Sequence, residues 1–136
     1  MMYLSFDDAE SESHFPLVYC VAFAFPARDR KDDWYYVPRL FDTSRSGDAG
    51  GDPGWHISRF TDEAGHVMYS AEYETHLTGV EPPYGEYDEA IVKRYVVRTM
   101  REYARVHPES ATQIEQLIQQ YRLEADVNPS DPSTDR

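Results

Sequence analysis

The chain has 136 residues, a formal net charge of −12 at pH 7, and 40% hydrophobic and 14% aromatic residues. This length and composition predict a single globular domain over residues 1–125, with a disordered polar tail over residues 126–136. The acidity argues against binding to nucleic acid or to anionic membranes, because both kinds of binding depend on lysine and arginine contacts with phosphates.

The compartment can be predicted from the apolar segments and the cysteine content. No apolar run is long enough to cross a membrane, and the N-terminal residues are acidic where a secretory signal would be basic. We therefore predict a cytoplasmic protein. The single cysteine, Cys20, lies in the apolar run LVYCVAFAF, so we expect a small buried residue, and neither an internal disulfide nor a multi-cysteine zinc site.

Three strands and a loop are predicted before residue 55. Residues 2–6 alternate between apolar and polar side chains, whereas residues 17–25 are apolar on both faces, which is typical of a central strand. Residues 34–41 predict a third strand, which Pro38 would restrict to a sheet edge or a bulge. The glycine-rich residues 42–54 predict a flexible loop, since the segment is acidic and lacks the spacing of a phosphate-binding loop.

Residues 55–75 predict a hairpin whose register can be argued. If Gly65 closes a three-residue turn in the left-handed region, Trp55 faces Tyr73 across the strands. One face then collects mainly apolar side chains, namely Trp55, Ile57, Val67, Tyr69, Ala71 and Tyr73. The other face is mostly polar and collects His56, Ser58, Phe60, His66, Met68, Ser70, Glu72, Glu74 and His76. A shift of one residue would scatter the aromatic side chains, so this register is preferred.

The C-terminal third predicts two helices after a crossover at residues 77–90. Apolar residues recur at helical spacing from Ile91 to Ala104, and the sequence His107-Pro108 ends this helix. The spacing of Ser110 and Gln113 fits a capping box that opens a second helix, with its inner face at Ile114, Leu117, Ile118 and Tyr121. The order of elements predicts an α+β fold, in which an antiparallel sheet of four to five strands is followed by two C-terminal helices packed on one face. The alternative is a further helix inserted earlier in the chain.

No motif in the sequence specifies a reaction. His56 and Glu72 lie opposite each other in the predicted hairpin, which suggests a metal or acid/base site. However, His66 and His76 are about 33 Å apart along an extended strand and cannot share one ion, and a lone His/Glu pair is more often a cross-strand ion pair. We therefore expect no cofactor and no metal, and keep a small enzyme or ligand-binding domain using the His56/Glu72 face as an alternative.

A basic stripe on the first C-terminal helix offers a second surface, formed by Lys93, Arg94, Arg98, Arg101 and Arg105. In so acidic a chain, a solvated helix face whose arginines pair with acidic strands is a simpler account than a nucleic-acid surface.

Tyrosine and tryptophan stand beside acidic residues in DDWYY and PPYGEYDE. Stiff aromatic side chains flanked by carboxylates suit tight binding to a basic protein. The residues expected to contact such a partner are Asp32, Asp33, Trp34, Tyr35, Glu72, Glu74, Tyr84 and Glu86.

In size, charge and lack of a catalytic motif, the chain resembles the immunity proteins with which bacteria neutralise toxins. This resemblance of class implies a protein that is not an enzyme but an inhibitor, either a monomer or a homodimer, that masks the active site of a basic toxin such as a nuclease. A permanent subunit of a larger assembly is a further alternative.

Overall fold

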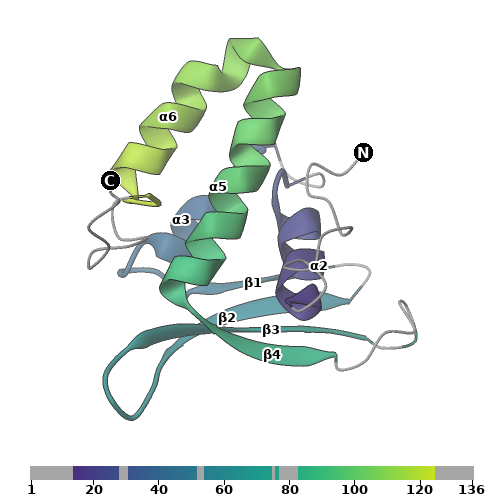
Figure 1. The fold of residues 1–136 in the computed structure, drawn as a ribbon, viewed down its shortest axis with the longest axis vertical. Helices are drawn as coiled ribbons and strands as arrows, with labels where there is room; N and C mark the ends of the chain where they lie inside the picture. The colour runs from purple at the N-terminus through teal and green to yellow at the C-terminus, as the bar shows by residue number, and fades with distance from the viewer. Residues whose placement is uncertain (1–13, 28–30, 52–53, 75, 77–82, 125–136) are drawn as a thin grey trace.

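A computed structural model describes residues 14–27, 31–51, 54–74, 76 and 83–124. One antiparallel sheet has the strand order β1 (Asp48–Gly51), β2 (Trp55–Thr61), β3 (Val67–Tyr73) and β4 (Tyr84–Asp88). Two helices, α5 (Glu89–Val106) and α6 (Ala111–Gln120), follow the sheet, and Figure 1 shows the helices gathered on one side of it. The predicted α+β class is therefore confirmed, with four strands in the sheet. The predicted strand at residues 2–6 and the tail at 126–136 lie outside the described residues.

The prediction of a central strand at residues 17–25 is wrong, because this segment forms the helix α2 (Phe15–Ala24). Both faces of the segment are apolar because the helix is enclosed: it packs on β2, β3 and α5. A helix that is hydrophobic all round belongs in a core. Pro16, in the first turn, supplies a fixed φ where no backbone donor is needed.

The predictions for residues 34–54 also need correction. Residues 34–41 form no strand, because the chain turns at Trp34 and then forms the short helix α3 (Tyr36–Phe41). The glycine-rich segment is not wholly a loop, since it contains β1, which pairs with β2. Side chains of α3 contact this strand: Arg39 Nε donates to the carbonyl oxygen of Asp48 at 3.1 Å, and the Tyr36 hydroxyl donates to that of Gly50 at 3.3 Å.

The hairpin register is confirmed. Trp55 pairs with Tyr73 and His56 with Glu72, and Gly65 has a φ of +89°. The turn is stabilised by Asp62, whose carboxylate accepts hydrogen bonds from two backbone N–H groups, those of Ala64 and His66, each at 2.9 Å. These bonds favour the charged form and lower the pKa of Asp62.

The two C-terminal helices are confirmed in position. Asp88 caps α5 by accepting from the backbone N–H of Ile91 at 3.0 Å, an interaction worth about 1 kcal/mol. A 3-10 turn, η1 (Pro108–Ser110), separates the two helices. The predicted capping box is wrong, because the Ser110 side chain makes no capping hydrogen bond. α6 packs on α5 through Ile114 and Ile118 rather than on the sheet.

Two arginines of the basic stripe of α5 are neutralised within the helical region. Arg101 pairs with Glu115 and Glu124, and Arg105 pairs with Glu102, so these arginines contact acids of the helical region rather than of the strands. None of the helices in the described part of the chain is long and apolar enough to span a membrane.

One cluster of buried residues joins the helical layer to the inner face of the sheet. Its largest side chains include Trp34, Tyr69 and Tyr95. Cys20 is fully buried and its thiol donates to the backbone carbonyl of Glu72 at 3.3 Å, which ties α2 to β3. Burial raises the pKa of the Cys20 thiol to about 12.

Cys20 is therefore expected to resist alkylation in the native protein. The thiolate is the reactive form, and at pH 8 a thiol with a pKa of about 12 supplies almost none of it. Iodoacetamide treatment followed by intact mass measurement should leave the native protein unmodified, whereas the urea-unfolded chain should gain one adduct. Complete modification of the native protein within minutes would contradict the buried position.

Candidate functional site: the open face of the sheet

The two faces of the sheet differ in what covers them. The inner face carries Trp55, Ile57, Tyr69, Ala71 and Tyr73, all at most 5% exposed beneath the helices. The opposite face, here called the open face, has no described helix packed over it (Figure 1). The side chains of the open face are those of Asp48, His56, Ser58, Phe60, Met68, Ser70, Glu72, Tyr84, Glu86 and Asp88.

Strand pairing places the polar side chains of the open face in two rows that run across the strands. One row consists of His56, Glu72 and Tyr84. The neighbouring row consists of Asp48, Ser58, Ser70 and Glu86. Side chains directly opposite each other in paired strands lie about 5 Å apart at Cβ. These two rows therefore form one continuous polar surface, next to the apolar Phe60 and Met68.

The open face is acidic. Asp48, Glu72, Glu86 and Asp88 contribute carboxylates, and no strand residue on this face is lysine or arginine. Arg59 of β2 belongs to the other side, where its guanidinium donates to the carbonyls of Leu40, Asp42 and Arg45. The carboxylates of the open face consequently have no strand cation beside them.

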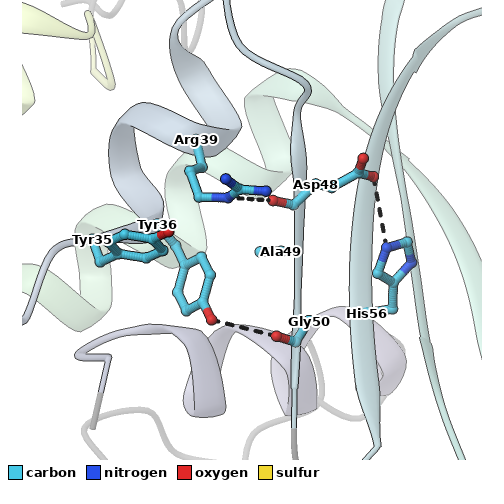
Figure 2. Close-up of a pocket in the computed structure, with 7 residues that line it drawn as sticks. All are labelled: Tyr35, Tyr36, Arg39, Asp48, Ala49, Gly50 and His56. Carbon is cyan, nitrogen blue, oxygen red and sulfur yellow. Dashed lines mark hydrogen bonds and ion pairs between the residues drawn. The ribbon is translucent and has the colours of Figure 1, made fainter. Parts of the chain in front are cut away.

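His56 is the only imidazole on this face within the paired strands. Its Nε2 lies 3.6 Å from a carboxylate oxygen of Asp48, and its Nδ1 lies 4.0 Å from one of Glu72 (Figure 2 draws the Asp48 contact). These distances are longer than a hydrogen bond but within reach of an ion pair when the ring is protonated. Among the residues that the structure describes, no group of three or more His, Cys, Asp or Glu side chains is arranged to hold a metal ion.

A shallow hollow lies beside His56, between α3 and β1 (Figure 2). Tyr35, Arg39 and Asp48 are among the residues that line it, and its volume is about 190 Å³. Small-molecule sites usually begin near 300 Å³. This hollow is therefore small for a ligand site and suits a single side chain of a larger partner better.

The hydroxyl of Tyr84 donates to a carboxylate oxygen of Glu86 at 2.6 Å. Because this bond favours the protonated hydroxyl, it raises the pKa of Tyr84. With 46% of its surface exposed, Tyr84 is one of the most exposed large aromatic side chains in the described residues. It places an aromatic ring within the acidic surface.

The structure brings together some of the residues predicted for partner binding and separates the others. Glu72, Tyr84 and Glu86 share the open face, and Glu74 follows directly after β3. Asp32 and Asp33 are exposed on the helical side instead, where Asp33 accepts a hydrogen bond from the Tyr103 hydroxyl of α5.

The two aromatic residues predicted beside these acids differ in how deeply they are buried. Tyr35 is half-buried and lines the hollow beside His56. The prediction that Trp34 contacts a partner is wrong, because Trp34 is only 2% exposed. Its ring packs edge-on against Tyr103 at 5.1 Å between centroids, so Trp34 belongs to the core.

Sequence reasoning missed Asp48 and Asp88 as members of the acidic surface. Asp48 lies in the glycine-rich segment whose composition predicts a loop, and DAGG shows no apolar alternation. Asp88 was assigned to the helix start, which it does cap, but its pairing with Met68 also places it at the end of β4. The alternation of the aromatic Tyr87 with the acidic Glu86 and Asp88 was the sequence signal available for β4.

Comparison with known proteins gives no relative. No family model matches the chain, and no curated protein or solved structure matches it either. Any functional conclusion therefore depends on the chemistry of the open face.

Proposed function

We propose that this protein is an inhibitor of the immunity type, which acts in the cytoplasm by binding a basic protein such as a bacterial nuclease toxin and masking its active site. The observation that carries the proposal is the open face, where Asp48, Glu72, Glu86 and Asp88 gather without a strand lysine or arginine.

The charge of the open face suits such a partner for a physical reason. An enzyme that acts on nucleic acid surrounds its active site with cationic groups that contact phosphates. A surface of closely spaced carboxylates can occupy the same groups, and it also accelerates the encounter, because opposite potentials steer two proteins together. Tyr84, exposed within the acidic surface, adds the kind of aromatic contact that contributes strongly to interfaces.

The side of the molecule opposite the open face is less suited to this role. Its carboxylates at Glu102, Glu115 and Glu124 already pair with arginines of α5. Carboxylates that already pair with arginines of the same molecule contribute less to the attraction of a cation on another molecule, so we place the interface on the sheet.

Removing charge from the open face is expected to slow association with the partner. The partner is first isolated from extract of the native cell on the immobilised protein. With the purified partner, association rates are then measured for the wild type and for Glu72→Gln/Glu86→Gln, from about 0.01 M to about 1 M salt, over which the Debye length falls from roughly 30 Å to 3 Å. The wild-type rate should fall at least tenfold, and at low salt the variant should associate several-fold more slowly.

The matched control is Glu109→Gln/Glu115→Gln, which removes the same charge from exposed positions of the helical region. The control variant should associate with the partner at nearly the wild-type rate. In a separate measurement, the partner should lose its enzymatic activity when the wild-type protein binds it. An association rate that ignores salt, an equal effect of both double variants, or a partner that remains active when bound would each refute the proposal.

A further inference from the structure

The sheet has two edge strands, and within the part of the chain that the structure describes only one of them is covered by side chains. The outward carbonyls of β1 belong to Asp48 and Gly50, and they accept hydrogen bonds from Arg39 and Tyr36 of α3 (Figure 2). Such covering protects an edge from pairing with another chain. The edge at the other end of the sheet is β4.

Hydrogen bonding between β3 and β4 determines which groups of β4 point outward. The backbone N–H of Tyr73 donates to the Pro83 carbonyl at 3.0 Å. Hydrogen-bonded positions alternate along an antiparallel pair, so Gly85 and Tyr87 also bond to β3. The N–H and C=O groups of Tyr84 and Glu86 therefore point away from the sheet. Among residues 83–124 and the other described segments, no backbone partner is recorded for them.

The charge of β4 decides between the strands that could pair with this edge. In a twofold pairing of two β4 strands centred on Glu86, the carboxylates of the two Glu86 residues would lie directly opposite each other, which is destabilising. A strand carrying lysine or arginine at that position would pair with Glu86 and lie near Asp88. Charge complementarity thus favours a basic strand over a second copy of this chain.

We propose that the free edge of β4 binds an extended basic segment of the partner as a fifth strand of the sheet. Backbone bonds to Tyr84 and Glu86 would supply affinity, as in other cases of strand addition. Alternate side chains of the added strand would lie on the open face, where cations meet Glu86, or on the inner side near Tyr87. This inference rests on the proposed function and specifies how the partner is bound.

The direct test uses a synthetic peptide of alternating lysine and valine, with amide hydrogen exchange followed by NMR. Binding should slow exchange at least tenfold at the Tyr84 and Glu86 amides, because their N–H groups become hydrogen-bonded. The Gly85 and Tyr87 amides already bond to β3 and should change little, which makes them internal controls. A peptide with N-methylated backbone nitrogens at its lysines keeps the charge but cannot pair, because the lysines opposite Tyr84 and Glu86 would make the bonds to β4, and it should give no protection.

A pair of variants separates the contribution of the backbone hydrogen bond to peptide binding from the contribution of the Glu86 charge. Glu86→Gln keeps the outward N–H, whereas Glu86→Pro removes it at a position where edge strands tolerate proline. Glu86→Pro should bind the lysine/valine peptide at least tenfold more weakly than Glu86→Gln, with circular dichroism confirming that both fold. If Glu86→Pro does not fold, the exchange measurement on the wild type decides the question alone.

Three outcomes would overturn the inference. The first is slow exchange at Tyr84 and Glu86 in the free protein, which would mean that the edge is already paired within the chain. The second is equal binding of both basic peptides without protection of these amides, which would leave charge-driven binding to the open face intact. The third is that neither peptide binds; the proposed function would then still be decided by the salt dependence measured with the partner protein.

Discussion

Replacing Trp34 with alanine is expected to lower the free energy of unfolding by about 3–5 kcal/mol. The indole is 2% exposed and packs edge-on against Tyr103, so its removal would leave a large cavity where α3 and α5 meet the core. Urea denaturation followed by circular dichroism measures the change as a shift of the midpoint at constant slope.

The matched control is Tyr35→Ala, at the adjacent half-buried aromatic residue, and its cost should be clearly smaller. This comparison separates the two interpretations of the DDWYY segment. If Trp34→Ala keeps the wild-type midpoint but loses affinity for a basic partner, Trp34 is a surface anchor, as the sequence suggested, and its placement in the core is wrong.

Replacing Gly47 with alanine should lower the free energy of unfolding by about 2–4 kcal/mol. Gly47 has a φ of +78°, which disfavours any residue with a Cβ, and an added Cβ would lie 2.7 Å from the Cβ of Arg59. Arg59 has little freedom to move aside, because its guanidinium donates to Leu40 at 2.7 Å and to Arg45 at 2.6 Å.

Gly65→Ala is the control that measures the cost of the left-handed backbone conformation alone. Gly65 has a similar φ of +89°, but no atom lies within 4 Å of an added Cβ. Its cost should be about 1–2 kcal/mol, which is the penalty of the left-handed conformation without a clash. Equal costs for the two variants in thermal or urea unfolding would show that Arg59 does not restrict the Gly47 site.

The hairpin and α5 were predictable because each pattern has one interpretation, whereas β4 lies in the segment predicted as a crossover. In β2 and β3, apolar and polar residues alternate on either side of a turn closed by Gly65, and a slip of one residue would bury Glu72. In α5, an apolar stripe at helical spacing follows a capping Asp88. Local periodicity and turn chemistry agree in these elements, so the register was predicted pair by pair.

The first half was not predictable because its signal is ambiguous. A short run that is apolar on every side, such as LVYCVAFAF, fits a buried strand and a buried helix equally well by periodicity. Pro16 is compatible with a helix start, but the packing of α2 between β3 and α5, which makes it apolar on every side, depends on the whole fold. β1 depends on contacts from Arg39 and Tyr36, which no pattern within DAGG reveals.

The same limits apply to the candidate site. Glu72 was predicted from the alternating hairpin and Glu86 as an acid beside tyrosines in PPYGEYDE, and both belong to the open face. Asp32 and Asp33 were grouped with them by composition alone, although the fold places them on the helical side, with Asp33 bound to Tyr103. Composition identifies residues suited to binding, but it carries no information about which of them share a surface.

The turn at Asp62–Gly65 also limits how this protein can evolve. Because successive strand residues face opposite sides, an insertion or deletion of one residue there would turn one arm of the hairpin over relative to the other. His56 and its polar neighbours would then exchange places with Trp55 and Ile57 against the helices. Substitutions at the exposed Glu63 and Ala64 can accumulate without altering the acidic surface, whereas the length of the turn must stay constant for the surface to exist at all.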